Sequence, residues 1–340
     1  MTKKWLMYTA FSTSTLLTLL LFLRLATHWP LLIKEWEKVE KTQIYYRKTN
    51  LKPHFRLYTG IVLLLALVEH VLANTRAIAK ALHCTDNDFL GVMRAYFIYN
   101  FHFVFVLTGY SHWKGFLLAI MNIIKTFSWS YMDLFIILIS VALADHFQAL
   151  NQYLATVTNK MQTQTFWRQV REDYNTLAML TRTVDRCLSK ILLLSFGSNL
   201  YFVCFQLLNS MRPLRDFNEA VYFYWSIIYL VLKVCAVSLC AASVHDYSKE
   251  PKTVLYSVPT ESYCTEVQRF LVQLTTDEVA LTGLNFFSVT RTFIMSVAGT
   301  IVTYEVVLLQ FNMASEMPPI PAPSSTNTTE ECQWLNSVAY

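Results

Sequence analysis

The sequence predicts an all-α, polytopic membrane protein, and four observations lead to this fold class. Of the 340 residues, 54% are hydrophobic and 15% are charged, whereas an average soluble domain carries about a quarter charged residues. The mean hydropathy is +0.34. Several apolar segments are long enough to cross about 30 Å of hydrocarbon as helices. Aromatic residues make up 15% of the chain, which suits helices flanked by Tyr and Trp at the membrane interfaces.

The six predicted spans are separated by polar segments. Residues 1–311 are therefore expected to form one helical transmembrane domain, with spans near 8–27, 57–75, 130–149, 190–209, 221–244 and 284–311. A seventh apolar region, residues 97–124, is interrupted by Ser111, His112, Trp113, Lys114 and Gly115. The two resulting pieces are too short to cross, so we expect a helical extracellular loop at the interface, with a membrane crossing as the alternative.

The distribution of basic residues predicts the orientation. The segment after the first span contains Lys34, Lys38, Lys41, Arg47, Lys48, Lys52 and Arg56, and the segment after the third contains Lys160, Arg168, Arg171, Arg182, Arg186 and Lys190. Both are expected to be cytoplasmic by the positive-inside rule. Residues 312–340 contain no Lys or Arg and are expected to form an extracellular tail, glycosylated at Asn327. A G-protein-coupled receptor has its C-terminus in the cytosol, so this topology argues against that class.

Other function classes lack their sequence signatures. The net charge of +5 comes from residues between apolar segments, which indicates topology and no nucleic-acid partner. The seven cysteines show no CxxC or Cys/His spacing, so they are interpreted mainly as small buried hydrophobic residues, and no metal or cofactor is expected. The sequence contains no HExxH or GxSxG motif, and we expect no enzyme. A secondary transporter remains an alternative, although the sequence shows no internal repeat.

Three segments resemble one receptor family. The last span ends with Thr303, Tyr304, five further residues, Gln310 and Phe311. This resembles the Thr-Tyr-(five residues)-Gln-Phe signature of insect gustatory receptors, here with Glu305 opening the interval. The stretches LTGLNFFSVTR (residues 281–291) and TFSWSYMDLFIILIS (residues 126–140) are similar to segments of the sugar-sensing, trehalose-receptor-like subfamily. The similarity extends from about residue 15 to residue 311.

The resemblance implies an insect chemoreceptor fold of seven helices with the C-terminus outside. The first span here aligns with the second helix of the family, so the first family helix is expected to be lacking. The implied function is a sugar-gated, non-selective cation channel subunit for sweet taste or nutrient sensing. It would form a homo- or hetero-tetramer in the plasma membrane of chemosensory neurons, with small sugars and cations as partners. A truncated or non-conducting receptor subunit is the alternative.

The resemblance assigns the pore to the last span. At helical spacing, Thr303, Val307 and Gln310 fall on one face, and Tyr304 and Phe311 fall on the next. A pore needs an apolar constriction that excludes water when closed and a polar group that admits ions when open. Gln310 and Phe311 could supply that pair. The alternative is an ordinary helix packed against its neighbours.

A sugar site is expected in the outer half of the membrane, because sugars offer hydroxyls and apolar ring faces to carboxylates, amides and aromatic side chains. Ionisable groups inside the membrane are candidates for function. The candidate ligand-binding residues are Glu69, His70, Trp129, Asp133, Gln206, Asn209, Tyr222, Tyr224 and Trp225. Two alternatives remain open. The three aromatic residues of the fifth span could form an interfacial belt, and the two acids could pair with Arg or His to hold helices together.

Overall fold

The computed structural model describes residues 2–42, 51–85, 88–157, 161–210 and 217–314, together with Cys332 and Leu335. These residues form helices and turns, with a single isolated β-bridge between Thr282 and Ser288, and the predicted all-α class is confirmed. The helices are α1 (Thr2–Thr42), α2 (Lys52–His83), α3 (Phe89–Thr108), α4 (His112–Val157), α5 (Gln164–Ser210), α6 (Phe217–Lys249), α7 (Pro251–Tyr256), the 3-10 helix η1 (Thr260–Ser262), α8 (Thr265–Thr276) and α9 (Arg291–Ala314).

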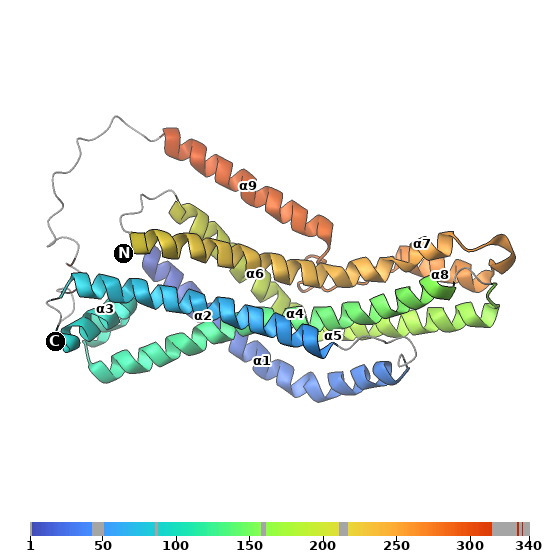
Figure 1. Cartoon of the computed structure of the whole chain (residues 1–340), viewed down its shortest axis with the longest axis horizontal. Coiled ribbons are helices and arrows are strands. Elements are labelled where there is room, and N and C mark those ends of the chain that lie inside the picture. Colours follow the sequence, from blue (N-terminus) through green and yellow to red (C-terminus); the bar gives the residue numbers. More distant parts are fainter. Residues whose placement is uncertain are drawn as a thin grey trace.

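The long helices form an elongated bundle around α4, α5 and α6 (Figure 1). Helix α1 packs against α4 and α5, and α2 packs against α4 and α6. The core is built from aliphatic and aromatic side chains such as Met132, Ile136, Leu188 and Val237, all of which are buried. Helix α9 diverges from the bundle and contacts α5 and α6.

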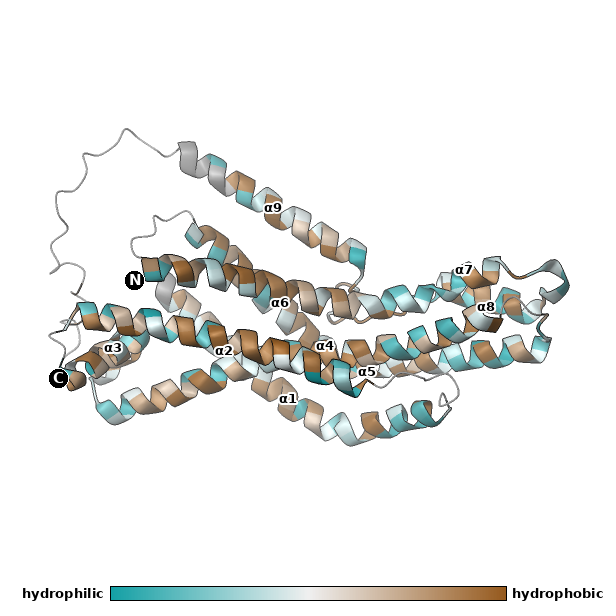
Figure 2. Ribbon diagram, viewed as in Figure 1, coloured by the Kyte–Doolittle hydropathy of each residue, from teal (hydrophilic) through white to brown (hydrophobic). Residues whose placement is uncertain are grey.

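The bundle is longer than a membrane is thick. Helix α4 has 46 residues, which corresponds to a length of about 69 Å at 1.5 Å per residue. Figure 2 shows that the end of the bundle near α7 and α8 is rich in hydrophilic residues. The described ends of α4 and α5 lie at this same end, and the end of α1 and the start of α2 are directed towards it (Figure 1). The positive-inside rule therefore makes it the expected cytoplasmic end.

In the described part of the chain, six helices are long and apolar enough to cross a membrane. Five of them contain the first five predicted spans, and the sixth is α3. Helix α3 is bent at Phe101, where φ is −123° and ψ is 30°. It ends at Gly109, whose φ of +70° is favoured by glycine. The chain then turns back into α4, where a side chain in place of Gly115 would collide with the Phe97 ring.

The last helix begins at Arg291, seven residues later than the predicted start of its span. The preceding turn is irregular because Leu284 and Asn285 have left-handed backbone conformations, with φ of 53° and 61°. Thr282 anchors this turn to α5 by donating two hydrogen bonds to Asp185, from its backbone N–H at 2.6 Å and from Oγ1 at 2.8 Å. Arg291 then pairs with Asp246 of α6 at 2.5 Å. The base of α9 is thus fixed to two helices of the bundle.

A second anchor lies at the hydrophilic end. Glu266 of α8 accepts hydrogen bonds from Arg171 of α5 and from Arg269, each at 2.9 Å. The hydrogen bond from Arg171 is the main reason that the pKa of Glu266 lies below its ordinary value of 4.5. Lys249 donates to the backbone carbonyls of Leu274 and Asp277 at 2.8 Å and 2.6 Å. These contacts hold α8 against the ends of α5 and α6.

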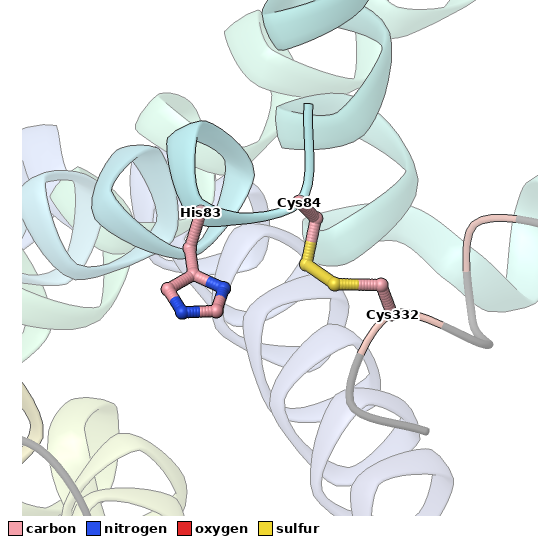
Figure 3. Close-up of side chains that lie close together, drawn as sticks. All are labelled: His83, Cys84 and Cys332. Atoms are coloured by element: carbon pink, nitrogen blue, oxygen red, sulfur yellow. A yellow bond between two sulfur atoms is a disulfide. The ribbon is translucent and has the colours of Figure 1, made fainter. Parts of the chain in front are cut away.

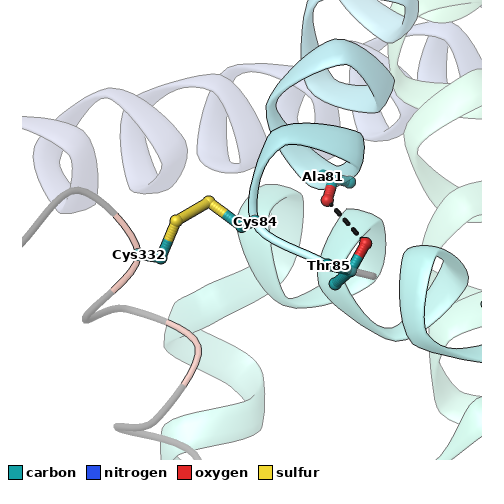
Figure 4. Close-up of a disulfide and its surroundings, with 4 residues drawn as sticks. All are labelled: Ala81, Cys84, Thr85 and Cys332. Carbon is teal, nitrogen blue, oxygen red and sulfur yellow. Dashed lines mark hydrogen bonds between the residues drawn. A yellow bond between two sulfur atoms is a disulfide. The ribbon is translucent and has the colours of Figure 1, made fainter. Parts of the chain in front are cut away.

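A disulfide joins Cys84, at the end of α2, to Cys332 in the C-terminal segment (Figure 4). The adjacent Thr85 hydroxyl donates to the Ala81 carbonyl at 2.9 Å and closes the last turn of α2. The interpretation of the cysteines as small buried hydrophobic residues is therefore wrong for these two. Their separation of 248 residues gave no local spacing from which a pair could be recognised. The other five cysteines are free.

Candidate functional site

A polar cluster lies inside the apolar bundle, centred on Asp133 of α4. Asp133 is fully buried and pairs with Lys233 of α6 at 2.7 Å. The Ser195 hydroxyl of α5 donates to Asp133 Oδ1 at 2.5 Å, and the Asn199 amide lies one turn further along the same helix, 3.4 Å from that oxygen. Buried charges are tolerated when they are paired and hydrogen-bonded. The Asp133 carboxylate meets both conditions, whereas Nζ of Lys233 is paired with Asp133 but makes no hydrogen bond with the described residues.

The lysine of this pair also contacts aromatic rings. Lys233 Nζ lies 3.0 Å from the centre of the Trp129 ring, and Trp129 is one helical turn from Asp133 on α4. Tyr229, one turn before Lys233 on α6, lies with its hydroxyl 3.3 Å from that of Ser130. A cation over an indole face is attracted by the ring quadrupole. The ammonium is therefore held between a carboxylate and an aromatic ring.

The same face of α6 continues towards the outer end and meets α2. Tyr222, Ser226, Tyr229 and Lys233 repeat at intervals of three or four residues along the helix. Ser226 donates to Glu69 of α2 at 3.2 Å. One turn earlier on α6, the guanidinium of Arg76 lies over the Tyr222 ring, 4.4 Å from the ring centre. Helix α2 thus adds an acid and a base to the outer side of the cluster.

Several polar atoms in and around this cluster are buried but make no hydrogen bond with the described residues. Besides Nζ of Lys233, five such atoms are Nε1 of Trp129, Nε1 of Trp225, Oε2 of Glu69, Oδ1 of Asn199 and Nε of Arg76. A buried polar atom without a partner costs about 1–3 kcal/mol and needs an explanation. Three of the five atoms belong to residues predicted from the sequence to contact a ligand. Indole N–H groups and carboxylate and amide oxygens are complementary to sugar hydroxyls.

The structure brings together four of the predicted ligand residues through direct contacts in this region: Glu69, Trp129, Asp133 and Tyr222. Trp225 lies on the same outer part of α6 and is half-buried. Tyr224 is 60% exposed and points away from the bundle, as an interfacial residue would. Gln206 and Asn209 are half-buried on α5, seven and ten residues beyond Asn199. His70 is half-buried, and its backbone carbonyl accepts a hydrogen bond from Asn74 at 2.7 Å.

Sequence reasoning missed Lys233, Ser195 and Asn199. Lys233 is the one charged residue within the predicted span 221–244, and a charged residue at membrane depth is itself a signal of function. Ser195 and Asn199 carried no such signal, because small polar residues are frequent in membrane helices. Their spacing of four places both on the helix face that meets Asp133.

The predicted pore residues lie on the outward side of α9. Thr303 and Gln310 are exposed, as are Tyr304 and Val307, at 43% and 40%. The side chain of Phe311 lies outside the described residues. At the base of α9, the ring of Phe293 stacks on Phe287 of the preceding turn with centres 4.5 Å apart, and lies 6.1 Å from the ring of Phe196 in α5. The outer face of the helix therefore has no neighbour among the described residues of this chain.

An apolar cavity of about 300 Å³ separates α9 from α5 and α6. Its walls include Phe196 and Val203 of α5, Val234 of α6, and Val297 of α9. Asn199, which approaches Asp133, also lines this cavity. One side chain thus connects the polar cluster to the space beside the predicted pore helix.

One group of potential metal ligands lies beside the disulfide. Among the described residues, His83, Cys84 and Cys332 form the one group of three potential metal ligands within 4.8 Å of each other (Figure 3). Both sulfur atoms belong to the disulfide, so neither is the thiolate that a metal requires. The glycosylation site predicted at Asn327 lies outside the described residues.

Solved structures support the fold. The olfactory receptor OR5 of the insect Machilis hrabei superposes with a TM-score of 0.62 at 13% identity, over 89% of this chain and 80% of that chain. The same receptor in complex with eugenol gives a TM-score of 0.58 at 14% identity, with the same coverage. These similarities show that the chain has the fold of an insect olfactory receptor. Together with its apolar helices, they show a multi-pass membrane protein.

Sequence comparisons identify the family. The family model described as trehalose receptor matches residues 4–319. The Drosophila melanogaster gustatory receptor for sugar taste 64f is 39% identical over 90% of this chain, and gustatory receptor 5a for trehalose is 35% identical over 89%. The chain spans 66% and 68% of the lengths of these two relatives. The chain therefore belongs to the trehalose receptor family of insect sugar gustatory receptors, which are receptors and not enzymes.

Proposed function

We propose that this chain is a subunit of a sugar-gated, non-selective cation channel for sweet taste or nutrient sensing, in the plasma membrane of chemosensory neurons. Sugar hydroxyls would bind the polar cluster between α2, α4, α5 and α6. The observation that carries this proposal is the set of buried polar atoms without partners on Trp129, Trp225, Glu69 and Asn199. The relatives named for sugar taste and for trehalose support the ligand class.

The chemistry of the cluster suits a neutral polyol. Hydroxyl groups can donate to the free oxygen of Glu69 and accept from the indole N–H groups of Trp129 and Trp225. A sugar adds no net charge, so it can enter without disturbing the charge balance of Asp133 and Lys233. Both hydrogen-bonding and aromatic groups are already in place, which reduces the ordering cost of binding.

Asn199 offers a route from the ligand to the pore helix. Its amide is 3.4 Å from Asp133 Oδ1, while the same side chain lines the apolar cavity against α9. A sugar that changes the hydrogen bonds of Asp133 would also move Asn199 and alter the packing of α5 against Val297 and its neighbours. Because α9 is fixed at its base through Arg291 and Thr282, such a change would tilt the outer part of α9.

The exposed face of α9 supports assembly into a channel. Thr303, Val307 and Gln310 share one face and are open to the surroundings in the single subunit. Gln310 at membrane depth needs a polar environment, and a water-filled pore between four copies of α9 would provide it. Homo- and hetero-tetramers with related receptors both satisfy this requirement.

Whole-cell recording of sugar-evoked cation current tests the proposal. Glu69→Gln keeps the shape of the side chain but removes its charge, and should raise the half-maximal sugar concentration about 10- to 150-fold, the range for loss of a hydrogen bond to a charged group. Trp225→Phe removes only the indole and its N–H and should shift the response in the same direction. Tyr224→Phe is the matched control, since Tyr224 points outward from the same helix segment.

The readout distinguishes loss of binding from loss of protein. Surface labelling should be equal for the wild type and the three variants. A curve for Glu69→Gln and Trp225→Phe that coincides with the control would remove the cluster from the sugar site. Absence of any sugar-evoked current in wild-type protein at the cell surface would favour the non-conducting subunit.

A further inference from the structure

A second pocket is lined by basic side chains. It lies between α1 and α5 and has a volume of about 210 Å³. Arg24 and His28 come from α1, and Arg186 and Lys190 come from α5. The remaining walls are mainly aliphatic, from Leu21, Leu25 and Ile191. At about 30 Å³ per water in the liquid, this space is several times larger than one water molecule.

These cations have no acidic partner in the described part of the chain. The ion pairs there involve other basic residues, among them Arg171, Arg182 and Lys233. The nearest acid in sequence, Asp185, is held by the backbone N–H and the hydroxyl of Thr282. Three formal positive charges therefore converge on one pocket without neutralisation, although such charges normally repel one another.

The imidazole of His28 is positioned to join them. Its Nδ1 lies 3.0 Å from the Arg24 carbonyl and 2.9 Å from the Thr27 hydroxyl. Both of these contacts are made by Nδ1, so Nε2 remains available for a ligand in the pocket.

The position of the pocket indicates where the anion comes from. Helix α1 enters the predicted span 8–27 from the outer side, so Arg24 and His28 lie at its cytoplasmic end. Helix α5 runs in the opposite direction, and Arg186 and Lys190 precede the predicted span 190–209. Both pairs thus lie at the expected boundary between the hydrocarbon and the cytoplasmic headgroup layer. Anionic lipids are concentrated in that leaflet.

We propose that this pocket binds the phosphate headgroup of an anionic phospholipid of the cytoplasmic leaflet. Arg24, Arg186 and Lys190 would contact the phosphate oxygens, and guanidinium groups can do so in a bidentate manner. The apolar wall of Leu21, Leu25 and Ile191 would contact the glycerol and the first part of the acyl chains. The lipid would join α1 to α5 next to Asp185, the residue that anchors the turn before α9.

Lipid retention by the purified full chain tests this proposal. The protein is reconstituted in phosphatidylcholine vesicles that contain a small fraction of phosphatidylinositol bisphosphate, and bound lipid is quantified by native mass spectrometry. Arg24→Gln combined with Arg186→Gln should weaken retention about 25-fold, at about fivefold for each basic side chain removed near the membrane. Arg24→Lys combined with Arg186→Lys keeps the charge and should retain most of the lipid.

The control removes the same charge outside the pocket. Lys34→Gln combined with Lys38→Gln alters exposed residues further along α1 and should change retention by much less than the pocket variant. Equal losses in the two double variants would overturn the pocket and leave only a diffuse basic surface. Equal retention of phosphatidylcholine and the anionic lipid by the wild type would also overturn it. Displacement of the lipid by an equal concentration of soluble inositol phosphate would overturn the assignment to a membrane lipid.

Discussion

Breaking the buried pair between Asp133 and Lys233 should destabilise the chain more when one partner is changed than when both are. The side chain of Asp133 is fully buried, and that of Lys233 is 3% exposed. Removing one member of such a pair leaves an uncompensated buried charge and costs about 3–5 kcal/mol. Lys233→Met would leave the carboxylate with hydrogen bonds from Ser195 and Asn199 only. Asp133→Asn would leave the ammonium with the Trp129 ring.

The double variant is the decisive comparison. Asp133→Asn with Lys233→Met removes both charges at similar volume, and such replacements are often neutral or stabilising. We therefore expect the double variant to recover most of the stability that each single variant loses. A recovery of about 3 kcal/mol corresponds to a change of more than a hundredfold in the folding equilibrium constant between the single and the double variants. Unfolding of purified protein, followed by thiol labelling of the half-buried free cysteines Cys187 and Cys240, measures the order of stabilities.

Two results would refute this reasoning. If both single variants are as stable as the wild type, the pair is hydrated and the buried cluster described above does not exist. If the double variant is as unstable as the singles added together, the two residues act independently. A double variant that is stable but no longer responds to sugar would instead separate the structural role of the pair from its role in the ligand site.

The other predictions concern the pore and the hydrophilic end. Phe311→Ser should give a sugar-independent cation current and Gln310→Leu a smaller open-state current, at unchanged surface labelling; wild-type gating in both would remove α9 from the pore. Because the pKa of Glu266 is lowered in the folded chain, its stabilising effect is complete above about pH 4.5 and disappears as pH falls through the lower folded pKa. Thermal unfolding of the wild type and of Glu266→Gln should therefore differ by a constant amount at neutral pH and converge in acid, and a difference that grows in acid would contradict this sign.

The fold could be predicted because the membrane imposes strong constraints on sequence. Apolar segments of about 20 residues are clear signals, and five of the six predicted spans lie inside helices of the structure. The start of α9 was harder to predict. Residues 284–290 continue the apolar pattern of the predicted span. They are not helical, because Leu284 and Asn285 have left-handed backbone conformations and Thr282 is hydrogen-bonded to Asp185. Such contacts between residues far apart in the chain cannot be recognised from the local sequence.

The candidate site was predicted only in part for a similar reason. Trp129 and Asp133 could be paired from their spacing of four on one helix. Asp133 and Lys233 are 100 residues apart in sequence and meet only because α4 packs against α6. The sequence indicated that Asp133 could pair with a basic residue of another helix. Which basic residue forms the pair depends on helix packing, and it is Lys233.

The disulfide between Cys84 and Cys332 also constrains how often the chain crosses the membrane. Two bonded cysteines lie on one side of the bilayer, so the number of crossings between them must be even. Among the described residues, the helices between them that are long and apolar enough to cross are α3, α4, α5 and α6, which is an even number. If α9 also crosses, as the proposed pore requires, one of the five helices stays on one side, and α3, bent at Phe101 and turned back at Gly109, has the geometry for it. Detection of the Cys84–Cys332 disulfide on a non-reducing gel would therefore show that the C-terminal segment and the end of α2 lie on the same side of the membrane.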